Sequence, residues 1–494
     1  MKNKTILGIA AGSHDASITI LEDNKIVFAS QSERYSKIKN DPNLNDELIK
    51  DSLNYITKPI NIVCFYEKPL LKKTRQIISC QFSELTSAYY KDSIKKVKKF
   101  VKNDFSIKCI NHHKTHASHA FISPYKESIV LVIDSIGEWD TISIWLFKNN
   151  ELKLLEAEKY PYSLGLFYSA FTQDVGLIPN EHEYILMGMS SFGKNDYSEL
   201  IKKFFNYNNK NNRFEYNFHK GLQTDFFKQY NKEDIAYSVQ LILEHILERI
   251  CFKVIKYQEK YNTNNLVYSG GVALNCVANS NVFLKYFTNI FIYPNPGDSG
   301  TSLGAVLFEN KDKINFDSIY LGHNIKKTIN IKEIVDYLIN KKIVGIANGR
   351  AEFGPRALGN RSLLADPREF DIKDKVNAIK KREEFRPFAP VILEEYFSKY
   401  FFTKKQNSSP YMQFTFVCKH PNNFPAIVHI DNTSRVQTIN EKQNSVFYFM
   451  LKEFYNRTGC PMLLNTSLNI KSQPIINDIN DVKEFEKLYN VKVF

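Results

Sequence analysis

Four histidines lie close together in the segment NHHKTHASHA, at positions 112, 113, 116 and 119. His112 and His116 are four residues apart, so on a helix both imidazoles project from one face and can share a metal ion. Asp134 ends the apolar strand SIVLVID, and Asp298 lies in the turn NPGDSGTSLG. Two imidazoles and two carboxylates suit iron(II), manganese or zinc and leave positions open for a substrate oxygen. The spacing does not select the metal, and helical histidine pairs also occur as ordinary polar residues.

Two glycine-containing turns resemble phosphate-binding loops. The string SGGVALN (269–275) follows the strand NNLVYS, and DSGTSLG (298–304) also stands between a strand and a helix. Glycine lets the backbone approach a phosphate, and a helix N-terminus favours negative charge. Tight turns need glycine in any case, but two such turns beside the histidines favour nucleotide binding. The predicted contacts are Gly270, Gly271, Asn275 and Gly300.

Arginine is concentrated in one segment. The chain has 66 Lys+Arg against 53 Asp+Glu and a formal net charge of +13, and six of its twelve arginines stand between residues 350 and 386. These are Arg350, Arg356, Arg361, Arg368, Arg382 and Arg386. A guanidinium group binds phosphate or carboxylate in a fixed bidentate geometry. The enrichment predicts a small anionic substrate, and the alternative is a set of ion pairs with Glu352, Asp366, Glu383 and Glu384.

The elements that must position these residues repeat along the chain. The strands TILGIAAG, ASITILED and NKIVFASQSE have a counterpart that begins with SIVLVIDSIGEWDTISIWLF, which predicts a duplicated α/β domain with facing turns. A Lys-rich helix is predicted over residues 91–104 and a long buried helix over 235–257. Charged residues and Asn dominate residues 308–335, so we expect domains of 1–325 and 326–494, the second opening with the strand KKIVGIANGR.

Composition excludes several classes of protein. Hydrophobic residues form 43% of the 494-residue chain, which indicates a globular core rather than disorder. No apolar stretch approaches the roughly 18 residues that span a bilayer. The N-terminal apolar run breaks at Ser13-His14-Asp15, which argues against a signal peptide. Seven scattered cysteines indicate reduced thiols, so we expect a cytoplasmic protein with no membrane partner.

Eight strings, in order along nearly the whole chain, resemble the O-carbamoyltransferases of the NodU and antibiotic-tailoring type. The strings are GSHDAS (12–17), HHKTHAS (112–118), VIDSIGE (132–138), SGGVALN (269–275), GDSGTSLGA (297–305), GRAEFGPRALGNRS (349–362), REEFRPFAP (382–390) and LLNTSLN (463–469). The resemblance implies an actin/sugar-kinase-like (RNase H-like) N-terminal domain and a YrdC-like C-terminal domain. It also implies iron(II) held by His112, His116, Asp134 and Asp298.

The implied reaction uses carbamoyl phosphate and ATP, the latter with Mg(II), to form a carbamoyl-adenylate whose carbamoyl group passes to a hydroxyl. Arg356 and Arg386 are the expected catalytic arginines. The expected carbamoyl phosphate ligands are Arg350, Arg356, Arg361, Lys380, Arg382 and Arg386, with Asn465 and Asn469 at the nucleotide or the carbamoyl amide. His14 either positions or deprotonates the acceptor or is an ordinary turn histidine. The chain departs from the family pattern at Ile185 and at Ser472-Gln473.

The acceptor is open at this point. Family members mostly modify sugars and other natural products, and we expect the same class here. The lysines of residues 91–102 offer a hydroxymethylated base in DNA as an alternative, unless they form a solvated helix face. Two further alternatives are an enzyme like the tRNA threonylcarbamoyl-transferase and a non-catalytic nucleotide-binding regulatory protein. The sequence leaves the oligomeric state open, a homodimer included.

Overall fold

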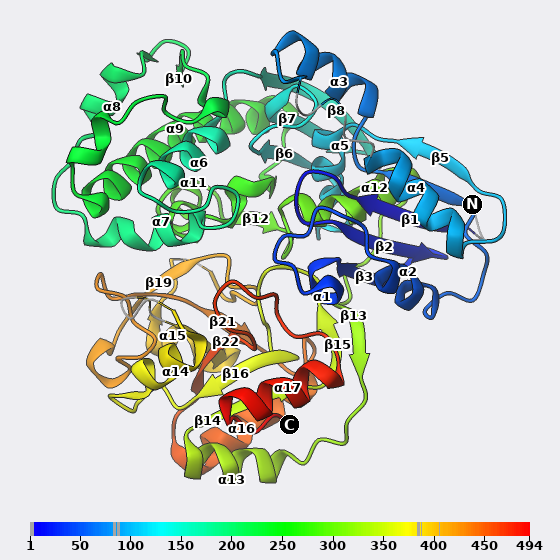
Figure 1. Cartoon of the computed structure of the whole chain (residues 1–494). Coiled ribbons are helices and arrows are strands. Elements are labelled where there is room, and N and C mark those ends of the chain that lie inside the picture. Colours follow the sequence, from blue (N-terminus) through cyan, green and yellow to red (C-terminus); the bar gives the residue numbers. More distant parts are fainter. Residues whose placement is uncertain (1–3, 83–84, 86–88, 383–385, 387, 405) are drawn as a thin grey trace. The chain divides into compact units, whose positions relative to one another are not determined.

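The computed structural model describes residues 4–494 apart from 83–84, 86–88, 383–385, 387 and 405 (Figure 1). It contains two compact units, which are Met1–Val27 with Pro42–Phe316 and Phe28–Asp41 with Asp317–Phe494. We call them unit 1 and unit 2. The expected boundary at 325/326 lies beyond strand β13 (Tyr320–Ile325), which pairs with β15 (Gly349–Glu352) of unit 2. Residues 28–41 also belong to unit 2, which the sequence pattern does not predict.

Two five-stranded sheets repeat one topology. The first has the order β3-β2-β1-β4-β5, and the second has the order β8-β7-β6-β11-β12. In each sheet the leading strand, β1 or β6, pairs antiparallel with the following strand and parallel with a later one, β4 or β11. That later strand pairs parallel with the last strand, β5 or β12. The predicted α/β class and its duplication are therefore confirmed.

The strands of the first sheet are β1 (Thr5–Ala10), β2 (Ser17–Glu22), β3 (Lys25–Gln31), β4 (Ile62–Phe65) and β5 (Ser106–Cys109). Those of the second are β6 (Ser128–Ile133), β7 (Asp140–Lys148), β8 (Glu151–Lys159), β11 (Asn265–Ser269) and β12 (Asn289–Ile292). Strands β1 and β6 are buried at every residue. Their near-continuous apolar sequences are those of strands covered on both faces.

Helix α12 (Thr301–Asn310) packs very closely on its neighbours. A Cβ added at Gly8 of β1 would lie 2.1 Å from the Ser302 carbonyl oxygen. One added at Gly304 would lie 1.9 Å from the carbonyl oxygen of Thr115 in α5 (His112–Ala117). These approaches require glycine and fix α5 and α12 against each other. Helix α5 begins at the predicted metal ligand His112, and the turn that bears Asp298 directly precedes α12.

Further helices cover unit 1. They are α2 (Asp46–Leu53), α3 (Pro69–Ile78), α4 (Tyr89–Phe100), α6 (Leu164–Asp174), α7 (Glu183–Met189), α8 (Ser198–Phe204) and α9 (Lys232–Tyr261). The predicted Lys-rich and long helices correspond to α4 and α9. Among the described residues, no helix combines the length and the apolarity needed to cross a bilayer.

Unit 2 is built on a second kind of sheet, with the order β14-β16-β22-β17-β21. Its strands are β14 (Ile343–Ala347), β16 (Arg361–Ala365), β22 (Met462–Ser467), β17 (Ala389–Leu393) and β21 (Gln437–Ile439). Its longer helices are α13 (Ile331–Lys341), α14 (Ile372–Lys380), α16 (Ser445–Thr458) and α17 (Ile479–Tyr489). Helix α14 ends at Lys380, just before the string REEFRPFAP, whereas the string LLNTSLN runs along β22 and passes its end at Ser467.

Candidate functional site

Four side chains of unit 1 converge on one point. His112 and His116 project from α5, Asp134 follows β6, and Asp298 lies at the turn before α12. The two imidazole Nε2 atoms are 3.2 Å apart, and each is 3.5 Å from Asp298 Oδ1. His112 Nε2 is also 3.2 Å from Asp134 Oδ2. All four residues are buried, with one ligand atom of each within 4.8 Å of the others. This donor set fits a divalent cation such as iron(II), manganese or zinc.

The cluster balances its own charges. Burial lowers the pKa of His112, but Asp298 and Asp134 outweigh that effect and raise it to about 9. Burial raises the pKa of Asp134 and of Asp298, yet the surrounding histidines hold both below their usual range. Without metal, the cluster therefore retains protons that a cation has to displace.

His14 lies at the more exposed side of this cluster, in the turn between β1 and β2. Its Nε2 is 3.5 Å from Asp298 Oδ2, and its Nδ1 is 3.1 Å from Asp15 Oδ2. Burial lowers its pKa, but Asp298 and Asp15 raise it to about 10. The side chain is 32% exposed, so a substrate can reach it. In the metal-free cluster the ring is protonated near neutral pH and donates protons rather than accepting them.

A buried carboxylate that the sequence analysis did not single out holds the start of α5. Both Glu138 carboxylate oxygens accept the His112 N–H at 3.1 Å. They also accept the Asn111 side-chain amide and the Lys68 N–H, each at 2.7 Å. These bonds satisfy free N–H groups at the helix N-terminus, from which His112 projects. The position of Glu138 in VIDSIGE, four residues after Asp134, is the signal that could have found it.

The predicted nucleotide-binding glycines make internal contacts. Gly270 has φ +95°, and a Cβ there would lie 2.1 Å from the Ile133 carbonyl oxygen. A Cβ at Gly300 would lie 1.9 Å from the Asn295 carbonyl oxygen. The Gly271 N–H donates to the metal-ligand candidate Asp134 at 2.8 Å. Close packing therefore explains these glycines, and their contact with a nucleotide stays a prediction.

Asn275, the fourth predicted nucleotide contact, caps a short helix. Its side-chain oxygen accepts the Ala278 N–H at 2.9 Å, and its amide donates to Gln240 at 2.9 Å. The side chain is 9% exposed. This arrangement favours a structural role over the nucleotide contact expected from the sequence.

In unit 2, the side chain of Lys380, the last residue of α14, lies against the end of β22. Its ammonium donates to the Ser467 carbonyl at 2.5 Å, and to the carbonyl and side-chain oxygens of Asn469 at 2.9 and 2.8 Å. Burial, with repulsion from Arg382 and Arg386, holds the pKa of Lys380 well below its usual range. Burial and the two neighbouring arginines thus both disfavour the charged form of the Lys380 amine.

Arg382 also belongs to this cationic group. Its guanidinium donates to the Asn377 side chain at 2.6 Å and to the Arg386 carbonyl at 3.2 Å, and it stacks 3.8 Å from the centre of the Phe388 ring. The structure brings together Lys380, Arg382, Arg386 and Asn469 among the predicted ligands. We call these four residues the unit 2 cationic cluster.

Arg361 differs from that cluster. It is fully buried, and its guanidinium donates to the backbone carbonyls of Asn348, Gly349, Asn360, His323 and Asn477 at 2.8–3.3 Å. These acceptors engage all of its N–H donors. The contacts favour a structural role over the phosphate contact expected from the sequence.

Two more arginines of the segment contact their own surroundings. Arg350 donates to the carbonyls of Leu321 and Gly322. Arg368 forms an ion pair with Asp366 at 2.7 Å, one of the pairs named in the alternative interpretation. Two other acidic residues of that alternative, Glu383 and Glu384, lie outside the described residues.

The remaining predicted contacts of unit 2 lie around the loop between β15 and β16. Glu352 accepts the N–H groups of Leu358 and Asn360 at 2.8 Å, which shapes the loop that bears the half-buried Arg356. Asn465 donates to the Ala357 carbonyl of this loop at 3.2 Å. Its own side-chain oxygen is buried with no hydrogen-bond partner among the described residues.

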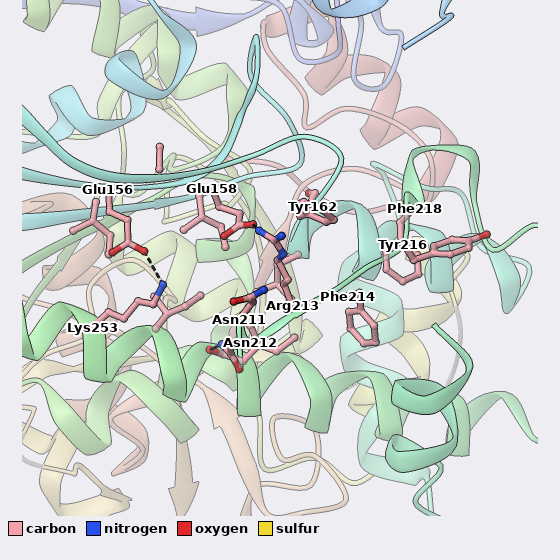
Figure 2. Close-up of a pocket in the computed structure, with 17 residues that line it drawn as sticks. Glu156, Glu158, Tyr162, Asn211, Asn212, Arg213, Phe214, Tyr216, Phe218 and Lys253 are labelled. Carbon is pink, nitrogen blue, oxygen red and sulfur yellow. Dashed lines mark hydrogen bonds and ion pairs between the residues drawn. The ribbon is translucent and has the colours of Figure 1, made fainter. Parts of the chain in front are cut away.

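A pocket in unit 1 lies apart from the predicted chemistry (Figure 2). Ile142 and Ile144 of β7 line it, whereas Ser143 between them contacts His113 of α5. Because strand side chains alternate, the pocket opens on the opposite face of the sheet from α5. Its charged rim is already paired, with Arg213 bonded to Glu158 at 2.6 Å. This pocket is therefore not the site of the predicted chemistry.

Helix α4 and the residues just after it bear the lysines of the DNA alternative, and several of these lysines bond within the protein. Lys96 donates to the Leu44 carbonyl at 2.7 Å, and Lys99 pairs with Asp46 at 2.6 Å. Lys102 donates to the Lys99 carbonyl at 2.9 Å. These bonds favour the solvated-face interpretation of the helix.

Comparison with known proteins identifies the family. The family described as carbamoyltransferase N-terminus matches residues 5–307, and that described as carbamoyltransferase C-terminus matches residues 335–493. An uncharacterized protein of Synechocystis is 31% identical, over 95% of this chain and 92% of its own length. Nodulation protein NolO of Bradyrhizobium diazoefficiens is 32% identical over 75% of each chain. The 3'-hydroxymethylcephem-O-carbamoyltransferase of Amycolatopsis lactamdurans is 32% identical over 49% of each chain. The chain therefore belongs to the carbamoyltransferase family of enzymes, as its motifs predicted.

Proposed function

We propose that this enzyme is an ATP-dependent O-carbamoyltransferase that works through a carbamoyl-adenylate. Carbamoyl phosphate, ATP and one water give the adenylate, phosphate and pyrophosphate. An acceptor hydroxyl then attacks the carbamoyl carbon and releases AMP, and the hydroxyl proton passes to a base. The observation that supports this most directly is the metal-ligand cluster of His112, His116, Asp134 and Asp298, in a chain that matches both carbamoyltransferase families.

Adenylate formation is assigned to the YrdC-like unit 2. The unit 2 cationic cluster offers a positive, partly buried environment for phosphate groups. A bound anion offsets the repulsion among Lys380, Arg382 and Arg386, so it restores charge to the Lys380 amine. Arg356 lies on the loop shaped by Glu352. We assign Arg356 and Arg386 as the catalytic arginines. The unpartnered Asn465 side-chain oxygen is available to a donor on the carbamoyl amide or the adenine.

Transfer is assigned to unit 1. A bound iron(II), or another divalent cation, polarises a carbonyl or phosphoryl oxygen. His14, whose Nε2 lies 3.5 Å from Asp298, would orient the acceptor hydroxyl at this side of the cluster. The turn of Gly270 and Gly271 follows β11 and bonds Asp134 through the Gly271 N–H, so it borders the proposed transfer site.

The proposed acceptor is a sugar or another hydroxyl-bearing natural product. The cephem-modifying relative acts on a hydroxymethyl group by its name, and half of this chain is similar to it. All seven cysteines are free thiols and five are buried, which is consistent with a reducing cytoplasmic location.

The test is an assay with ATP, Mg(II), carbamoyl phosphate and iron(II). Release of pyrophosphate without acceptor supports adenylation, whereas no release favours the non-catalytic regulatory alternative. Adding a panel of sugars, nucleosides and hydroxymethylated DNA, with detection by mass spectrometry, identifies the acceptor. Carbamoylation of DNA alone would overturn the natural-product assignment but not the chemistry.

A further inference from the structure

A buried chain of hydrogen bonds leads from the metal-ligand cluster to the turn before α12. Ser269 Oγ, at the end of β11, lies 3.4 Å from His116 Nδ1 and 2.9 Å from His119 Nδ1. The same oxygen is 3.3 Å from the Pro296 carbonyl oxygen. His119 Nε2 lies 3.1 Å from the Gly300 carbonyl oxygen. The three side chains are fully buried, so these partners are not replaced by bulk water.

The direction of each bond follows from chemistry. The Gly300 carbonyl can only accept, so His119 Nε2 has the proton of that bond. The His119 side chain is fully buried and its two ring nitrogens contact a hydroxyl and a carbonyl, which favours the neutral ring with a lone pair on Nδ1. The Ser269 hydroxyl donates to this lone pair at 2.9 Å rather than to Pro296 at 3.3 Å. The remaining lone pairs of Ser269 then accept the Nδ1 proton of His116.

From this network of hydrogen bonds we infer that Ser269 and His119 are positioning residues. They fix the tautomer of His116, with its proton on Nδ1 and its lone pair on Nε2. Nε2 is the atom that faces Asp298 and His112. A metal binds the unprotonated nitrogen, and the bond made by the other nitrogen selects it. The inference rests on the proposed metal site.

Both ends of this hydrogen-bond network lie at the metal-ligand cluster. The short helical turn η8 (Asp298–Gly300) supplies the acceptor for His119 at one end and a ligand candidate at the other. A displacement of this turn therefore moves Asp298 and the Gly300 carbonyl together. The arrangement couples the orientation of the His116 ring to the position of Asp298.

A neighbouring pair offers a matched control. Ser143 Oγ of β7 lies 2.8 Å from His113 Nδ1 and accepts the Trp145 indole N–H at 2.8 Å. Both Ser143 and His113 are fully buried, as Ser269 and His119 are. His113 is not among the four ligand candidates. Ser143→Ala thus removes a buried hydroxyl from a Ser–His pair without touching the proposed relay.

The test measures metal affinity of the full chain by competition with a chromophoric chelator, using zinc and, without oxygen, iron(II). Ser269→Ala should weaken metal binding by about 10- to 100-fold, the range for loss of a hydrogen bond to a metal ligand. Ser269→Thr, which keeps the hydroxyl, should bind metal nearly as tightly as the wild type. Ser143→Ala should retain wild-type affinity. Thermal unfolding of each metal-free variant reports separately on packing.

Three results would overturn the inference. Wild-type affinity in Ser269→Ala would show that His116 needs no partner. An equal loss in Ser143→Ala, or no rescue by threonine, would point to general packing instead of the hydroxyl. If the wild-type chain binds neither metal, the proposed site itself fails, which is distinguishable from the first two results.

Discussion

The metal-ligand cluster of unit 1 and the arginine segment of unit 2 are both dense in charge, yet they use it differently. In the cluster, side chains of opposite charge from three separate segments meet with their ligand atoms within 4.8 Å. In the arginine segment, guanidinium groups such as that of Arg361 are engaged by backbone carbonyls. The cationic side chains of this region that lie close together are those of the unit 2 cationic cluster. Local enrichment of one residue type therefore indicates a site less reliably than convergence of different types from distant segments.

The largest expected effect separates the two regions by function. His116→Ala removes one ligand, so bound metal should be lost and carbamoyl transfer should fall by about a thousandfold or more, since a metal contributes several kcal/mol. Pyrophosphate release from ATP and carbamoyl phosphate should continue, because unit 2 is unchanged. Loss of both activities together would contradict the division of labour between the units. His245→Ala, on the same unit but outside the cluster, is the control.

The converse experiment targets the cationic cluster. Arg386→Ala should slow adenylate formation by about 100- to 1000-fold, the usual effect of losing one preorganised donor to a developing charge. Metal content should stay at the wild-type level. Isotope exchange between pyrophosphate and ATP measures the first quantity, and metal analysis of the purified protein measures the second. Wild-type exchange would remove Arg386 from the proposed site.

A smaller effect distinguishes a structural arginine from a binding one. Arg361→Lys keeps the charge but offers three donors in place of five, so several buried carbonyls lose their partners. We expect a loss of about 2 kcal/mol in the free energy of unfolding. Arg386→Ala, measured in the same denaturant titration, should change stability much less. Equal stability of Arg361→Lys and the wild type would restore Arg361 as a ligand candidate.

The smallest expected effect is a gradual change of metal affinity with pH in the metal-ligand cluster. Because the pKa of His112 is raised to about 9, this ring is protonated below that pH and a metal must displace its proton. Metal affinity should therefore rise by about tenfold per pH unit up to pH 9 and then level off. Titration calorimetry in buffers of different ionisation enthalpy counts the protons released. A pH-independent affinity would show that His112 is not a ligand.

Much of unit 1 was predictable because its signals are local. The i,i+4 spacing of His112 and His116 gives a shared helix face, and the repeated strand–turn–strand pattern gives the duplication. Glu138 was not identified because its role depends on where Lys68 and Asn111 fold around it. The domain boundary was misplaced because β13 pairs with β15, which follows it in the chain, and sequence composition does not report pairing.

Unit 2 was harder to interpret from the sequence. The string of arginines was visible, but which guanidinium groups contact backbone carbonyls depends on loop geometry. Arg361 starts a buried central strand, so its side chain is enclosed, whereas Arg386 follows the end of a helix by several residues. Lys380 and Asn469 are separated widely in sequence, and only folding places the ammonium against the amide oxygen.

Because residues 28–41 belong to unit 2, this unit is difficult to produce as a separate fragment. Arg34 of this segment is buried and donates to the Gly354 carbonyl, and Lys37 pairs with Asp481. A fragment that starts at residue 317 lacks both partners, so unit 2 cannot be isolated by a single cut. During synthesis, residues 28–41 are made long before residues 317–494, so this segment waits for the rest of unit 2 to emerge. The polypeptide thus connects the two units at residues 27/28 and 41/42 as well as at 316/317.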